Sequence, residues 1–240
     1  MQICKKEVVF MSKEMSRREF MRASAATGAV LMAGGLSPAF AQELKPIQLL
    51  APQLDGGRSL MQALKDRRST RWYSKKEIPL QVLSNLLWTA VGVNRPHIGL
   101  RTAPQRLSCG GIDIYVATAD GVFFYEAKEN VLNPIVAEDV RNLSGQQYPP
   151  PGMYGGPVGE APVNLIYVWD GLKNPRYSDE LNLCLAFSLT GFISQNAYLY
   201  CASEGLVTVV RNWFAKPALE KKMKLRPEQY ATLVQSVGYP

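Results

Sequence analysis

Residues 179–204, DELNLCLAFSLTGFISQNAYLYCASE, are the stretch around which the rest of the chain is organised. The stretch is long, is apolar on most sides and is followed by Gly205, a residue that commonly ends a helix. It therefore predicts one long, buried helix. Small residues recur along it at nearly helical spacing, which would let another helix approach closely, within the chain or from a second subunit. These small residues are Gly191, Ser194, Ala197 and Cys201.

Strand patterns occur on both sides of this helix. Residues 112–117 and 122–125 alternate with a period of two, and Asp120-Gly121 between them is typical of a hairpin turn. Three further apolar segments also predict extended structure. They are residues 162–169, 206–210 and 230–237.

Amphipathic patterns predict the shorter helices. In the clearest, residues 79–93, Leu83, Leu87 and Ala90 fit the helical period and Pro79 suits the first turn. The other predicted helices are residues 59–65, 135–143 and 216–223. Strands and helices that alternate around one mixed central sheet predict a single α+β domain.

Two segments rich in glycine and proline are expected to be loops. They are residues 94–111 and 144–161. The second has a length that is often seen in functional flaps of compact domains.

The first 41 residues have the order of features that defines an export signal. Ser16–Arg22 contains a twin-arginine pair, residues 23–36 are apolar and rich in small residues, and Ala39-Phe40-Ala41 forms a cleavage site. We therefore expect a Tat signal peptide at 1–41 and a mature domain at 42–240. A short membrane anchor is the alternative, but the apolar run is shorter than the ~20 residues that span a bilayer. The expectation is transient contact with the Tat translocase, no stable membrane insertion, and a periplasmic or exported location.

The charge balance argues against nucleic acid as a partner. The whole chain carries 27 Lys+Arg and 20 Asp+Glu, a formal charge of +7. Residues 1–41 contain six of the positive and three of the negative charges, which leaves +4 for the mature chain. No dense stripe of Lys and Arg remains to bind a phosphate backbone. The 47% hydrophobic and 20% charged residues are those of a globular protein.

Few side chains are suited to direct catalysis. His97 is the only histidine and lies in a predicted loop, where we expect it to be exposed rather than catalytic. The mature chain has Cys109, Cys184 and Cys201 and no C-x-x-C motif, so neither a zinc site nor a disulfide framework is implied. We therefore expect no metal and no catalytic side chain, and a cofactor that carries the chemistry. Tat export, which carries folded proteins, also favours a cofactor loaded before export.

The densest polar cluster is Arg67-Arg68-Ser69-Thr70-Arg71. Guanidinium groups present forked donors that match the oxygens and charge of a phosphate, although a solvated basic turn has the same composition. Arg211 closes an apolar strand. It is either a residue at the rim of a cleft, where it could steady an anionic ring or phosphate, or a surface charge.

Together these segments resemble the nitroreductase superfamily of FMN-dependent oxidoreductases. The resemblance extends over nearly all of residues 60–240 and is strongest to the branch that contains exported nitroreductase-like proteins and azoline dehydrogenases. The segments that carry it are Asp66–Arg71, Leu83–Gly92, Arg101–Pro104, Ile112–Val116, Gly205–Arg211 and Val237–Pro240.

The resemblance implies an α+β flavoprotein that forms a homodimer with FMN at the subunit interface, where the long helix would lie. The motif residues Arg67, Arg68, Ser69 and Arg71 would hold the FMN phosphate and ribityl chain. Residues near the isoalloxazine ring would be Pro104, Ser108, Val209, Val210, Arg211 and Asn212.

The chain departs from the family pattern in two places. The family has approximately P-S-A-x-N-x-Q after Pro104, whereas Ser108 and Gly110 stand here for the Asn and Gln. The atypical segment Gln105–Gly111 could cost ~1 kcal/mol for each neutral hydrogen bond lost to the flavin. The sequence also stops at Pro240, where relatives carry a basic tail, so we expect the phosphate to depend more on the arginine motif.

These features predict an FMN-dependent oxidoreductase of nitroreductase type. Electrons would pass by a ping-pong route from a reduced donor, NAD(P)H in vitro, to a nitroaromatic, quinone or similar small-molecule acceptor. One alternative is a degenerate relative that binds flavin without turnover, which the 105–111 segment favours. Another is a dehydrogenase of modified peptides, against which the export signal argues.

Overall fold

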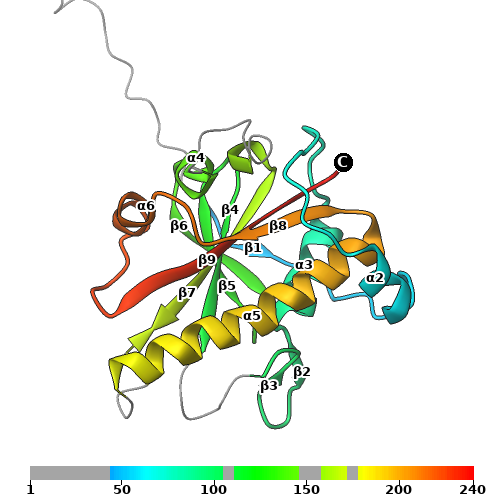
Figure 1. The fold of residues 1–240 in the computed structure, drawn as a ribbon, viewed down its shortest axis with the longest axis horizontal. Helices are drawn as coiled ribbons and strands as arrows, with labels where there is room; N and C mark the ends of the chain where they lie inside the picture. The colour runs from blue at the N-terminus through cyan, green and yellow to red at the C-terminus, as the bar shows by residue number, and fades with distance from the viewer. Residues whose placement is uncertain (1–43, 105–110, 146–157, 172–177) are drawn as a thin grey trace, which may run out of the picture. The chain divides into compact units, whose positions relative to one another are not determined.

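The computed structural model describes residues 44–104, 111–145, 158–171 and 178–240. Its centre is a seven-stranded sheet (Figure 1). From edge to edge the strands are β1 (Ile47–Gln48), β6 (Val131–Val136), β5 (Val122–Glu126), β4 (Ile112–Ala117), β7 (Val163–Asp170), β9 (Gln229–Gly238) and β8 (Val207–Arg211). All ladders between these strands are antiparallel, and an isolated parallel bridge joins Ser69 to Thr208 at the β8 edge.

Helices cover both faces of this sheet. They are α2 (Leu60–Asp66), α3 (Leu80–Val91), α4 (Arg141–Gly145), α5 (Asp179–Glu204) and α6 (Lys216–Lys222), with a short 3-10 helix at Val158–Glu160. Figure 1 shows α5 running across the sheet, with α2 and α3 beside its C-terminal half. The predicted α+β architecture, a large sheet flanked by helices, is confirmed.

The central strand β7 shows how the sheet builds two cores. All eight of its residues are buried. Because side chains alternate across a strand, Tyr167 and Trp169 pack with α3 and α5, whereas Ile166 and Val168 pack with Leu219 and neighbouring residues on the side of α6. Burial on both faces explains why the sequence of this strand is nearly continuous in apolar residues.

Helix α5 begins and ends where the sequence predicts. The Ser178 hydroxyl accepts the N–H of Leu181, and Gly205 ends the helix in the left-handed conformation with φ of 72°. Of the small residues, Ser194, Ala197 and Cys201 are buried within the chain, while Gly191 is exposed. The small-residue stripe therefore serves mainly internal packing. Large apolar side chains are exposed at other positions along the helix: Leu183, Phe187 and Phe192.

Helix α3 is also close to its prediction, although it ends earlier. Gly92 leaves the helical conformation, and Val93 begins β2 (Val93–Arg95), which pairs with β3 (Leu100–Arg101). This small hairpin lies inside the segment that we expected to be a loop. His97 is exposed in its turn, as predicted.

The predicted helix at 135–143 is wrong. Residues 131–136 instead form β6, which pairs with β5, and α4 begins only at Arg141. Asn130 has a φ of 54° and turns the chain into β6, so a local turn and a non-local ladder override the helical pattern. Strand β1 pairs with β6 through only two residues. A strand this short has too few residues to show an alternating pattern, so the sequence did not predict it.

Several predictions fall outside the described residues. These concern the signal peptide, Ser108 with residues 105–110, and the central part of the 144–161 loop. In the described part of the chain, no helix is both long and apolar enough to cross a membrane.

Candidate functional site

The arginine motif leaves α2 and runs along the edge of the sheet. The Ser59 hydroxyl caps the start of α2, and the N–H of Arg67 closes its end on the carbonyl of Ala63. From there the chain is bound to β8, where Ser69 bridges Thr208 and the N–H of Thr70 donates to the Thr208 carbonyl at 2.9 Å. We call residues 67–74 the strap. It brings the predicted phosphate-binding motif beside the predicted ring-binding strand.

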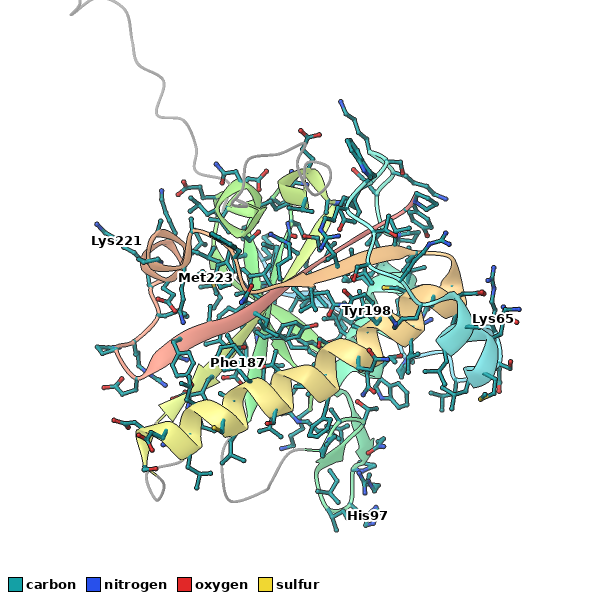
Figure 2. All side chains as sticks on the ribbon, viewed as in Figure 1. Lys65, His97, Phe187, Tyr198, Lys221 and Met223 are labelled. Carbon is teal, nitrogen blue, oxygen red and sulfur yellow. The ribbon has the colours of Figure 1, made fainter. Side chains whose placement is uncertain are left out.

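Tyr198 of α5 lies beneath the strap and joins it to β8. Its hydroxyl is 2.8 Å from the hydroxyl of Ser69 and accepts the N–H of Val210 at 2.9 Å. The guanidinium carbon of Arg67 lies 5.1 Å from the centre of the Tyr198 ring, a cation–π distance. Figure 2 shows Tyr198 on the side of α5 that faces these segments. Sequence reasoning missed this residue.

A signal for Tyr198 does exist in the sequence. Within the described chain the side chain is only 6% exposed, and a buried tyrosine generally needs a hydrogen-bond partner for its hydroxyl. A tyrosine in an otherwise apolar helix therefore indicates a polar group opposite it. The sequence does not reveal which group, because Ser69 is 129 residues away.

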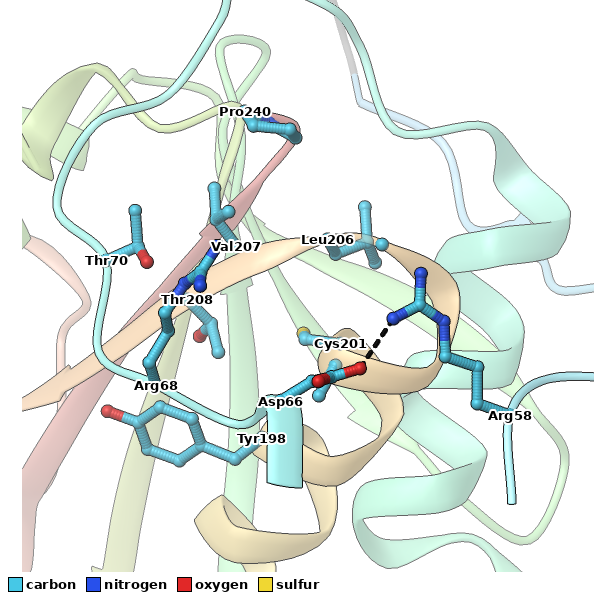
Figure 3. A pocket seen from close by; sticks show the side chains of 12 residues that line it. Arg58, Asp66, Arg68, Thr70, Tyr198, Cys201, Leu206, Val207, Thr208 and Pro240 are labelled. Atoms are coloured by element: carbon cyan, nitrogen blue, oxygen red, sulfur yellow. Dashed lines mark hydrogen bonds and ion pairs between the residues drawn. The ribbon is translucent and has the colours of Figure 1, made fainter. Parts of the chain in front are cut away.

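A cavity of about 300 Å³ opens beside the strap (Figure 3). Arg68 and Thr70 line it from the strap, and Val207 and Thr208 line it from β8. Its remaining lining residues come from α2, α5 and the segments next to them, together with the end of β9. They are Arg58, Asp66, Tyr198, Cys201, Ala202, Gly205, Leu206 and Pro240.

The charges around this cavity are unevenly paired. Asp66 accepts hydrogen bonds from Gln62 at 2.8 Å and from Arg58 at 2.6 Å, and these bonds hold the pKa of its carboxyl below the usual value. Arg58 is thereby neutralised. Arg68 and Arg71 have no hydrogen bond or ion pair to any other described residue. Of these two, Arg68 lines the cavity, so the strap presents there a positive charge that no described residue neutralises.

Arg211 takes neither position that the sequence left open. It is buried, 6% exposed, and donates to the carbonyl of Ser144 at 2.8 Å and to the hydroxyl of Ser236 at 2.7 Å. Burial lowers the pKa of its guanidinium to about 10, so the group remains charged at neutral pH. Its Nε has no acceptor among the described residues. Arg211 is therefore not a surface charge. Through its hydrogen bond to the carbonyl of Ser144, it connects β8 to the first residue of the 144–161 segment.

The other predicted ring-binding residues lie in different environments. Val209 is buried, Val210 is half-buried and Asn212 is exposed after β8. Pro104 is exposed after β3, and the chain that follows it through Ser108 is outside the described residues. Their proposed contacts with flavin stay predictions.

The site has the donor chemistry of an FMN phosphate site. The guanidiniums of Arg68 and Arg71, which have no acceptor among the described residues, and the hydroxyl of Ser69 are all donors. The cavity is at the lower end of the range for ligand pockets, which suits the phosphate and ribityl part of a flavin. Within the described ranges, no three His, Cys, Asp or Glu side chains are grouped to hold a metal. The residues present fit the anionic end of FMN.

The sheet, the helices on its two faces and the cavity beside the strap define an α+β protein with a basic segment at the edge of its sheet. Residues 64–239 match the nitroreductase family, and the chain belongs to this family. Its function is accordingly that of an oxidoreductase.

Individual relatives agree with this assignment. A protein of Methanocaldococcus jannaschii that is provisionally named a nitroreductase is 26% identical over 178 residues, 72% of this chain and 86% of that protein. A crystal structure from Ralstonia eutropha, also provisionally named a nitroreductase, is 34% identical with a TM-score of 0.74 and covers 82% of this chain and 90% of that one. A structure of the E. coli microcin synthetase complex shares the fold, with a TM-score of 0.60, 17% identity and 92% coverage of both chains.

Proposed function

We propose that the protein is an FMN-dependent oxidoreductase that passes electrons from a reduced small-molecule donor, NAD(P)H in vitro, to a nitroaromatic, quinone or similar acceptor. The observation that carries this proposal is the strap on β8. The strap runs along the edge of β8, where Arg68 lines a cavity and Ser69 lies against Tyr198 of α5. Membership of the nitroreductase family supports the reaction class.

The residues of the chain would divide the work of binding. Arg68 and Arg71 would neutralise the phosphate, because neither is committed to a carboxylate among the described residues. The backbone of Val209 and Val210 would lie along the cofactor, held in place by the pairing of β8 with β9. FMN, when bound, would accept a hydride and release electrons to the acceptor. The protein's own contribution is therefore orientation and charge stabilisation, and no acid or base side chain is required.

The proposal includes a homodimer and an exported location. Support for the dimer comes from the exposed apolar side chains of α5, which a second subunit would cover. Support for export comes from the twin-arginine segment and the Ala39-Phe40-Ala41 site in the sequence. Nicotinamide cofactors are scarce outside the cytoplasm, so the donor in the cell would be a different reduced molecule.

The visible absorption spectrum tests this function directly. The full chain is purified without added flavin, and the spectrum is recorded before and after incubation with FMN and removal of the excess. We expect the absorption of an oxidised flavin that bleaches on addition of NAD(P)H and returns with a quinone. A colourless protein that also fails to retain added FMN contradicts the proposal. A protein that retains FMN but never bleaches with any donor supports the alternative of a flavin-binding protein without turnover.

A further inference from the structure

The hydroxyl of Tyr198 has two hydrogen-bond neighbours among the described residues, the N–H of Val210 and the hydroxyl of Ser69. A phenol carries one proton, and its oxygen here accepts the N–H of Val210, which can only donate. Among the residues that the structure describes, the other neighbour is the Ser69 hydroxyl at 2.8 Å. A buried phenolic proton needs an acceptor, and in the described part of the chain the Ser69 oxygen lies within hydrogen-bond distance to serve as one. Ser69 then cannot use its own proton on Tyr198.

We propose that Tyr198 is a positioning residue that directs the proton of the Ser69 hydroxyl outward, toward the phosphate of the bound ligand. This inference rests on the proposed function, since the ligand concerned is FMN. Ser69 is an exposed residue between Arg68 and Thr70, which line the cavity, so a ligand can reach its freed proton. The donors form a chain from the Val210 N–H through Tyr198 to Ser69.

Two further contacts support a positioning role. The ring of Tyr198 lies under the guanidinium of Arg67, so the same side chain holds two residues of the motif. Its hydroxyl is also fixed to the backbone of β8, which couples the strap to the strand next to the cavity. Hydrogen bonds in such a chain polarise one another, which makes the terminal hydroxyl a better donor.

Helix α5 provides a matched control. Tyr200 is two residues further on, and its hydroxyl donates to the carbonyl of Val82 in α3 at 3.3 Å. The change Tyr200→Phe removes the same atom from the same helix without touching the strap. Tyr198→Phe keeps the ring under Arg67 and removes only the hydroxyl.

A double-mutant cycle on FMN affinity tests the inference. The dissociation constant of FMN is measured by flavin fluorescence for the wild type, Tyr198→Phe, Ser69→Ala and the double variant, with melting temperatures of the flavin-free proteins alongside. We expect each single change to weaken binding about tenfold, as for a hydrogen bond to a charged group, and the double change to weaken it no further. Tyr200→Phe should leave the affinity unchanged.

The outcomes separate this inference from the proposed function. If the wild type binds FMN and the effects of the two changes multiply, Tyr198 acts independently of Ser69 and the inference is overturned, while the function stands. If Tyr200→Phe weakens FMN binding as much as Tyr198→Phe does, the inference is likewise overturned while the function stands. If the wild type does not bind FMN, the proposed function fails and the inference fails with it. Should Tyr198→Phe not fold, Ser69→Thr and Ser69→Ala decide: weakening in both overturns the inference, whereas weakening in Ser69→Ala alone supports it.

Discussion

At the scale of single residues, three neighbouring arginines have three different surroundings. Arg67 is placed on the ring of Tyr198, Arg68 lines the cavity, and Arg71 lies near the buried guanidinium of Arg211, whose pKa its charge helps to lower. A chain in extended conformation points successive side chains to opposite sides, which explains part of this division. The motif is therefore a set of distinct positions rather than one cluster of charge.

Loss of a single arginine from the strap should weaken FMN. We expect Arg67→Ala or Arg71→Ala to lower the free energy of FMN binding by ~1.5–3 kcal/mol, the range for hydrogen bonds to charged groups. Lys65→Ala removes an equal charge from the end of α2 and should have little effect. Isothermal titration with FMN measures all three. Unchanged affinity in both arginine variants would mean that the phosphate is bound elsewhere.

At the scale of secondary-structure elements, α4 shows how a short helix is held in place. Asp139 accepts the backbone N–H of Arg141 at 3.0 Å, and its carboxylate also receives the Arg141 guanidinium at 2.7 Å. These bonds, chiefly those from the guanidinium, hold the pKa of Asp139 below its usual value of 3.8. At the other end of α4, the carbonyl of Ser144 accepts from Arg211.

The lowered pKa of Asp139 predicts a dependence of stability on pH. The folded-state pKa is below the unfolded one, so the stabilisation is present above about pH 3.8 and is lost as the pH falls through the folded-state value. The Asp139 side chain is 42% exposed, so we expect only a fraction of ~1 kcal/mol. Urea unfolding at pH 6 and pH 3 should show a smaller acid-induced loss in Asp139→Asn than in the wild type. An identical loss in both would exclude this contribution.

The elements that the sequence predicted correctly are those whose signal is local. Helix α5 and the β4–β5 hairpin each contain the full periodicity and the turn residues that define them. Strand β6 was not predicted, because it contains no clear periodicity of its own and is defined by its pairing with β5. The site divides in the same way. The arginine motif is contiguous, whereas the contact between Tyr198 and the strap joins residues 129 positions apart.

At the scale of the whole molecule, packing within one chain does not explain the apolar side chains that are exposed along α5. Phe187 is 39% exposed and Phe192 is 51% exposed, although both belong to the helix that anchors the core. Gly191 lies between them with open space around it. Apolar area of this kind on a long helix is typical of an interface between subunits.

A charge on this face should disrupt the proposed dimer. We expect Phe187→Asp to convert a dimer to a monomer, because an unpaired carboxylate would be buried at the interface. Ile135→Asp is the matched control, since Ile135 is 38% exposed on β6, away from α5. Light scattering coupled to gel filtration gives the mass of each variant. A wild type that is already monomeric contradicts the dimer, and a Phe187→Asp variant that remains dimeric contradicts an interface at this part of α5.

The position of the strap on β8 has a consequence for how the protein behaves without its ligand. Strand β8 ends the sheet, and the strap occupies its outer hydrogen-bonding edge through Ser69 and Thr70. If the strap detached, that edge would offer free main-chain groups to any extended segment of a second molecule, which is how sheets begin to aggregate. The contacts that hold the strap on β8 therefore also cover this edge, and a cofactor that fixed the strap in place would protect the molecule from self-association.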